Sequence, residues 1–123
     1  MADQPLTADA FMEGHPLGTT ALAWVRHVLS GHGPFRERVG RSQIAFHGRR
    51  GYAYLWLPGR YLSQHGDDVV LSLALDHEVR SPRIKEVAHP SPQTWMHHVE
   101  IQDAGALDDE LASLLLSAAR LVL

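Results

Sequence analysis

The stretch Val69-Val70-Leu71-Ser72-Leu73-Ala74-Leu75 decides the fold, because it is the clearest strand in the chain. Its odd-numbered residues are all large and apolar, and they alternate with Val70, Ser72 and Ala74. Successive side chains of a strand point to opposite faces of a sheet, so this alternation gives one face that is fully apolar. The sequence therefore predicts a strand over residues 69–75 that buries one face against a second layer.

Helix and hairpin patterns precede this strand. Apolar residues at helical spacing predict a helix over residues 19–30, with a shorter helix over 8–13 that Thr7 can cap. Residues 42–47 and 52–57 have the composition of two strands, and the turn between them predicts a hairpin. Within the second strand, alternation places three aromatic residues on one face, which favours packing over a stacking platform: Tyr52, Tyr54 and Trp56.

The region after residue 75 is less regular. Residues 76–94 show no strong period and contain three prolines, so we expect a long ordered loop with at most one short strand or turn near 84–87. Alternation returns over residues 95–101 and predicts another strand. A final helix is expected over 104–120, with Asp103 as its cap.

These elements predict a single α+β domain over residues 1–123, with an N-terminal extension or short helix over 1–16. Strands joined by short turns, with helices at both ends, favour a two-layer sandwich. We expect a mainly antiparallel sheet of about four to five strands, flanked by an N-terminal and a C-terminal helix.

Composition excludes several classes of protein. The chain has no cysteine, so disulfides, thiolate metal sites and cysteine nucleophiles are excluded. Residues 1–5 lack the pattern of a signal peptide, and no apolar run approaches the roughly 18 residues of a membrane span. We therefore expect a cytoplasmic protein. The net charge of −3 argues against a nucleic-acid binder, although residues 36–60 carry six arginines and one acid.

The first candidate for chemistry is the polar group on the strand 95–101. His98 and Glu100 lie two residues apart and share a face, so they could act as a base and its orienting carboxylate, or as two metal ligands. His97 is the second candidate base, and it points to the opposite face. A cross-strand hydrogen bond on a half-exposed sheet explains His98 and Glu100 equally well. No metal-ligand spacing such as HExxH is present, and we expect no metal or cofactor.

The second set of candidates could bind an anion. Arg83 and Lys85 would point the same way if this proline-flanked segment is extended, and a guanidinium binds carboxylate or phosphate bidentately. Arg41 and Gln43 could present donors to one side of the first strand, and Trp95 completes the predicted ligand site. Solvated loop residues with local ion pairs are the alternative interpretation of the basic side chains.

Motif blocks in a fixed order point to a known family. Ser42-Gln43-Ile44-Ala45-Phe46 comes first, followed by Tyr52-Ala53, Ser81 to Val87, Trp95-Met96-His97-His98 and Leu107 to Leu111. Over roughly residues 17–122 the chain resembles the bacterial proteins, many of them actinobacterial, that are grouped as domain of unknown function 5655. The resemblance implies a small α/β fold in a cytoplasmic bacterial protein. It carries no established activity and therefore assigns no catalytic residue.

The sequence leaves three functional hypotheses open. In the first, a site between the sheet and the loop 76–94 binds an anionic small molecule, and His98 or His97 carries out acid/base chemistry. In the second, the arginine-rich hairpin makes the chain a non-catalytic module that binds a partner protein or nucleic acid. In the third, which is compatible with both, the chain forms a homodimer through a strand edge or an exposed sheet face and buries Trp56 and Trp95 between the subunits. Whether the protein is an enzyme stays open.

Overall fold

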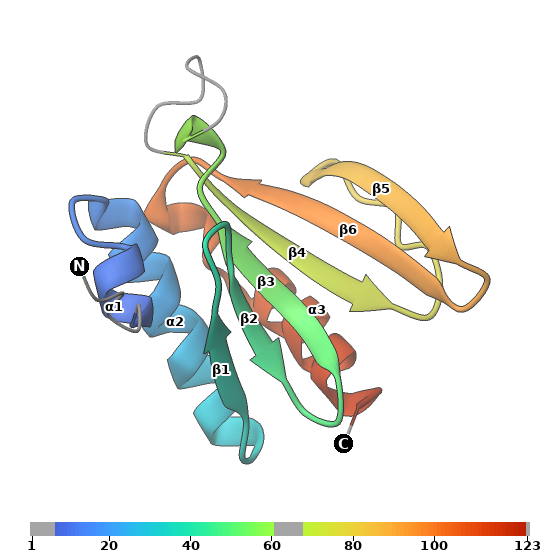
Figure 1. Cartoon of the computed structure of the whole chain (residues 1–123). Helices are drawn as coiled ribbons and strands as arrows, with labels where there is room; N and C mark the ends of the chain where they lie inside the picture. The colour runs from blue at the N-terminus through green and yellow to red at the C-terminus, as the bar shows by residue number, and fades with distance from the viewer. Residues whose placement is uncertain (1–6, 61–67, 123) are drawn as a thin grey trace.

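The computed structural model describes residues 7–60 and 68–122, so residues 1–6 of the expected N-terminal extension lie outside the described part. These residues form six strands and three α-helices, with all helices packed on one face of the sheet (Figure 1). The strands are β1 (Arg36–Val39), β2 (Ile44–His47), β3 (Gly51–Trp56), β4 (Val69–Leu75), β5 (Ile84–Ser91) and β6 (Thr94–Ile101). The helices are α1 (Ala8–Phe11), α2 (Pro16–His32) and α3 (Asp109–Arg120), with two short 3-10 helices, η1 (Pro58–Arg60) and η3 (Ala104–Ala106).

The sheet is antiparallel throughout, and its strand order is β1-β2-β3-β4-β6-β5. The strand that the sequence marks most clearly, β4, lies in the interior of the sheet between β3 and β6. Leu71 of β4 pairs with Leu55 on one side and Val99 on the other. The predicted α+β sandwich is confirmed, with one or two strands more than expected.

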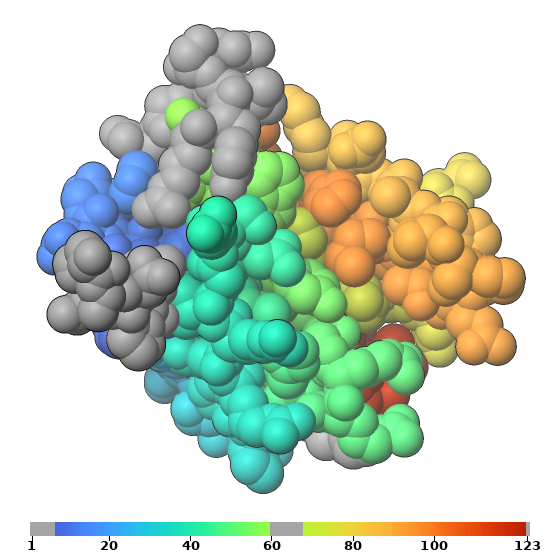
Figure 2. Space-filling model, viewed as in Figure 1, coloured from blue at the N-terminus to red at the C-terminus, as the bar shows by residue number. Residues whose placement is uncertain are grey.

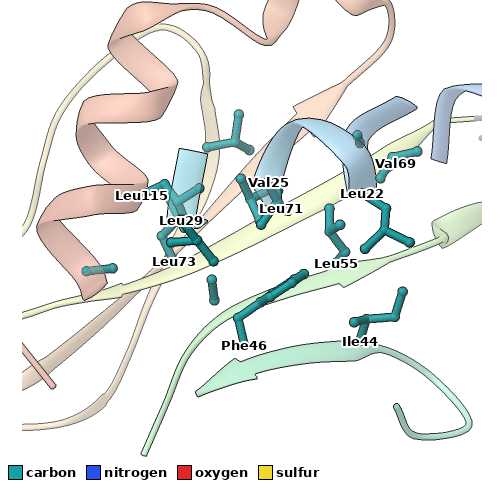
Figure 3. Packing of buried hydrophobic residues seen from close by; sticks show 14 of the residues in the cluster. Leu22, Val25, Leu29, Ile44, Phe46, Leu55, Val69, Leu71, Leu73 and Leu115 are labelled. Carbon is teal, nitrogen blue, oxygen red and sulfur yellow. The ribbon is translucent and has the colours of Figure 1, made fainter. Parts of the chain in front are cut away.

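The core lies between the sheet and the helices. Leu71, Leu73 and Val69 of β4 are fully buried and face Leu22 and Val25 of α2 (Figure 3). These are the residues at the odd positions of the 69–75 stretch, so the alternation predicted the buried face correctly. Leu115 of α3 and Phe46 of β2 belong to the same cluster, as do most of the large buried side chains.

The helix boundaries differ from the predicted ones for local reasons. Helix α2 begins at Pro16, three residues before the predicted start, because proline suits the first turn of a helix. It ends at His32, before Gly33. Helix α3 begins at Asp109, where Asp108 accepts the Leu111 N–H at 3.1 Å. The predicted cap Asp103 instead caps η3 through the Gly105 N–H at 2.8 Å.

Strand β1 lies where the sequence predicted no element, and β5 is longer than the one short strand or turn expected near 84–87. Both β1 and β5 are edge strands, and each is more exposed than the interior strands. The expected loop 76–94 is in fact a shorter loop, the eight-residue strand β5 and a tight turn into β6. Pro90 is tolerated in β5 because an edge strand has one side without ladder partners.

Strand β1 is attached to the helices by one arginine. Arg26 of α2 donates to both carboxylate oxygens of Glu37, from Nε at 2.6 Å and from Nη2 at 2.8 Å. Its Nη1 also donates to Asp9 of α1 at 3.1 Å. Bidentate guanidinium–carboxylate pairs of this kind fix geometry as well as charge. The only acid among residues 36–60 is therefore engaged in holding α1, α2 and β1 together.

The expected shared face of three aromatic residues is only partly correct. Phe46 pairs with Ala53 and His47 with Gly51, so the register shift makes a β-bulge at Tyr52, near the start of β3. Tyr52 is buried in the helix-side core, where it lines a cavity with Leu29 of α2. Tyr54 and Trp56 face the other side of the sheet. A bulge breaks strict alternation, which explains why the three rings divide between the two faces.

Candidate functional site

The face of the sheet opposite the helices has small side chains along its central strand and large ones beside them. Ser72 of β4 pairs with Tyr54 of β3 and His98 of β6, and Ala74 pairs with Met96. Figure 2 views this face, with β4 visible between the green atoms of β3 and the orange atoms of β6. We call the groove over Val70, Ser72 and Ala74 the furrow.

A hydrogen-bonded chain of three side chains crosses the furrow. The indole Nε1 of Trp56 donates to Ser72 Oγ at 2.9 Å, and Ser72 Oγ lies 2.7 Å from His98 Nδ1. The Trp56 and His98 rings also meet edge to face, with centroids 6.3 Å apart. Ser72 is only 3% exposed, so its hydroxyl depends on these two partners.

The Ser72 hydroxyl holds one nitrogen of the His98 ring. An indole N–H can only donate, so Ser72 Oγ accepts from Trp56 and keeps its own proton to donate. The Ser72 oxygen has a second lone pair, so it either accepts from His98 Nδ1–H or donates to a bare Nδ1, according to the tautomer. The contact at Nδ1 therefore fixes the ring of His98 and leaves Nε2 as the nitrogen that a ligand can use.

Two cavities adjoin this bridge, one on each side. The first, of about 420 Å³, is lined by Gln43, Tyr54 and Met96 together with the bridging residues. The second, of about 390 Å³, is lined by Lys85, Glu86 and Glu100 with the same Trp56 and His98. Both volumes lie in the range of small-molecule sites. His98 is thus the polar side chain that reaches both cavities beside a fixed aromatic ring.

A β-bulge in β5 brings two charged residues to the second cavity. Ile84 pairs with Val99 and Glu86 pairs with His98, so Lys85 and Glu86 together oppose one residue of β6. Lys85 and Glu86 both line the cavity beside His98. Bulges redirect side chains and are frequent beside active sites. The predicted ligand-binding residue Lys85 therefore lies next to the predicted base.

His97 has a different environment from its neighbour. It lies on the helix side of the sheet and is 1% exposed. Its Nδ1 lies 3.0 Å from the Trp95 carbonyl oxygen, to which it donates, and its Nε2 accepts the Val79 N–H at 2.9 Å. Burial lowers the pKa of His97 below its ordinary value. Both ring nitrogens are occupied by backbone groups, so the geometry supports His98 over His97 as the base.

Arg83 lies apart from His98 and Lys85. Its Nη1 donates to Asp108 at 2.7 Å and to Glu110 at 2.9 Å, and its Nη2 donates to the Ala106 carbonyl oxygen at 2.6 Å. The Leu111 N–H and then Arg83 lower the pKa of Asp108. Arg83 therefore anchors the start of β5 to the N-terminus of α3, and the predicted pairing with Lys85 does not occur because β5 begins only at residue 84.

Replacement of Arg83 by alanine is expected to lower the free energy of unfolding by about 1–3 kcal/mol, because it removes three charge-assisted hydrogen bonds from a side chain that is 17% exposed. Urea unfolding measures this loss. Arg80→Ala is the matched control: its side chain is 88% exposed and 3.8 Å from Glu78, so about 0.5 kcal/mol or less is expected. Equal losses in both variants would contradict an anchoring role.

The other predicted site residues are spread over the domain. Gln43 lines the first cavity and Glu100 the second, where Glu100 also accepts a hydrogen bond from Gln102 at 2.7 Å. Arg41 is exposed in the turn between β1 and β2. Trp95 stacks on His89 with ring centroids 3.9 Å apart, and it lines a separate cavity of about 550 Å³ near the turn between β5 and β6.

Sequence reasoning missed two members of the bridge, Trp56 and Ser72. Ser72 is the single polar residue in the stretch 69–75, which is a usable signal. Its partners depend on the strand order, and no pattern within one strand gives that order. Among residues 7–60 and 68–122, no group of three or more histidine or acidic side chains could hold a metal ion. Within the same ranges, no helix has the length and apolar character needed to cross a membrane.

The fold and the site define a class: a two-layer α+β domain with helices on one sheet face and a polar, hollowed opposite face. The chain belongs to the family described as "Domain of unknown function (DUF5655)", whose model matches residues 20–120. That match spans all six strands, all of α3 and α2 from residue 20 onwards. No curated protein matches the chain, and no solved structure matches it.

Proposed function

We propose that the furrow binds a small molecule with an anionic or strongly hydrogen-bond-accepting group, and that His98 exchanges a proton with it. The observation that carries this proposal is the Trp56–Ser72–His98 bridge between two cavities. When Nδ1–H of His98 donates to the Ser72 hydroxyl, Nε2 keeps its lone pair and can act as a general base, and the protonated ring can act as a general acid from Nε2–H. The lack of cysteine suits the bacterial cytoplasm that we propose as its location.

Donors and apolar surface occur together around the bridge. His98 Nε2–H, Lys85 and the Gln43 amide can donate to an anionic group, and Trp56, Tyr54 and Met96 offer apolar surface beside them. The acids Glu86 and Glu100 also line the second cavity. They favour a ligand that carries hydrogen-bond donors as well as its anionic group. The four residues of the proposal that the sequence also predicted are His98, Lys85, Gln43 and Glu100.

A thermal-shift and calorimetric screen against anionic metabolites tests this proposal, with His98→Ala as the variant. A ligand at a hundred times its Kd adds about 2.7 kcal/mol of stability. We expect such a stabilisation in the wild type and a loss of most of it in His98→Ala. His27→Ala is the matched control, because His27 is exposed on α2, and its response should equal that of the wild type.

Stabilisation that persists in His98→Ala would overturn the role of His98. Absence of any binding would favour the interaction module as the second candidate function. One observation supports that candidate: Arg36, Arg38, Arg41, Arg49 and Arg50 are all exposed, while the one acid among them, Glu37, is paired with Arg26. This local excess of positive charge suits an acidic protein surface or nucleic acid, with binding that weakens as salt rises.

A further inference from the structure

A further cavity lies on the helix side of the sheet, on the face opposite the furrow. It has a volume of about 430 Å³ and opens between the carboxyl ends of α2 and α3 and the turn that joins β2 to β3. Its walls are mostly apolar and include Leu29, Phe35, Tyr52, Ala119 and Val122. The volume is in the range of small-molecule sites, and the apolar lining favours a hydrocarbon or aromatic group.

The polar groups at this cavity are basic or neutral. Arg36 and Arg49 line it and are exposed, so they lie at its rim. His32 and His47 also line it, and the Nε2 atom of each is buried without a hydrogen-bond partner. Buried nitrogens without a partner are rare in folded proteins and call for one. No acidic residue belongs to the described lining.

From these observations we infer that this cavity binds an amphipathic monocarboxylate, with its apolar part among Leu29, Phe35 and Val122 and its carboxylate at the rim. Guanidinium groups bind carboxylates through paired hydrogen bonds, which Arg49 and Arg36 can supply. Arg36 already donates one bond, from Nη2 to the Gly48 carbonyl oxygen at 2.9 Å, which holds its side chain near the rim. The imidazoles of His32 and His47 gain an acceptor for Nε2–H when the carboxylate enters.

The charges at the cavity agree with an anionic head group. The carboxyl ends of α2 and α3 each contribute about half a unit of negative charge, and this effect fades within the last turn. Two guanidinium groups contribute two full positive charges, and His32 stands in the last turn of α2. The positive charges outweigh the two helix ends, so the balance favours a carboxylate at the arginine rim.

Isothermal titration calorimetry on the full chain tests the inference with octanoate as the probe. We expect octanoate to bind, acetate to show no measurable binding, and octan-1-ol to bind at least tenfold more weakly than octanoate. Lengthening the chain from hexanoate to octanoate should strengthen binding about fourfold per methylene, as expected when the added groups are buried.

Arg49→Gln combined with His47→Gln should weaken octanoate binding at least tenfold. Arg50→Gln is the matched control, because Arg50 is the next residue but lines a different cavity, near the turn between β5 and β6. His98→Gln in the furrow should also leave octanoate binding unchanged, so this result is independent of the function proposed for the furrow.

Three results would overturn the inference. No heat of binding from octanoate would remove the site. Equal affinity for octanoate and octan-1-ol would show that the basic rim does not recognise the carboxylate. Binding that is lost in His98→Gln and retained in the Arg49 and His47 double variant would place the ligand in the furrow.

Discussion

Replacement of Leu71 by alanine is expected to lower the free energy of unfolding by about 3–5 kcal/mol, the largest effect of any change considered for this domain. Leu71 is fully buried, and it pairs with Leu55 and Val99 in the two neighbouring strands. Its side chain faces α2 (Figure 3), so truncation leaves a cavity that α2, β3 and β6 would have to close together. Urea unfolding followed by circular dichroism measures the loss.

The matched control for Leu71 is Leu114→Ala. Leu114 lies on α3 and is only partly buried against the core. The same chemical change should therefore cost less than half as much there. Similar costs at both positions would mean that the interior of the sheet is not the centre of the core.

Replacement of His97 by leucine should have the second-largest effect, about 2–4 kcal/mol at neutral pH. Leucine fills much of the space but leaves the Val79 N–H and the Trp95 carbonyl group without their partner. His97 itself is 1% exposed, so water has little access to the two backbone groups that lose their partner, and leaving them unpaired is costly. The measurement is again the free energy of unfolding, and His27→Leu on the exposed face of α2 should be close to neutral.

His97→Leu also tests how the stability of the domain depends on pH. Burial lowers the pKa of His97 in the folded state, so below about 6.5, the ordinary histidine value, the unfolded chain binds this proton and the folded chain does not. The contribution of neutral His97 to the free energy of unfolding is therefore complete above that pH and is lost as the pH falls towards the pKa of the folded state. The loss is at most about 1.4 kcal/mol per pH unit. The stability difference between wild type and His97→Leu should shrink between neutral pH and pH 5. A constant difference would contradict a neutral His97.

The sequence predicted the interior of the sheet better than its edges, for a physical reason. Strands β3, β4 and β6 each bury one face against helices, and this burial imposes the alternation that the sequence shows. Strand β5 buries almost none of its side chains, so burial imposes no alternation on it. The sequence therefore predicted a loop there, with at most a short strand or turn near 84–87. Strand β1 has four residues, too few for a period to be recognised.

The sequence predicted those features of the candidate site that follow from a single strand. It missed the contacts that require several strands to be neighbours. Alternation within β6 correctly separated His98 from His97 onto opposite faces. The bridge to Ser72 and Trp56 requires β3, β4 and β6 to be neighbours in a given register, which local patterns do not contain. Arg83 and Lys85 were expected to point the same way, but Arg83 precedes β5 and the bulge at Lys85 resets the alternation.

The two outer strands determine how this protein can meet a second copy of itself. Strand β5 contains Pro90 and two register shifts. One shift is the bulge at Lys85 and Glu86, and the other lies between Ala88 and Ser91. Such an edge is a poor template for a further strand, because a missing N–H and an irregular ladder interrupt continuous pairing. Strand β1, at the other margin, is short and exposes Arg36 and Arg38, which would repel their counterparts in a twofold pair. Within the described residues, both edges of the sheet therefore disfavour pairing with a further strand.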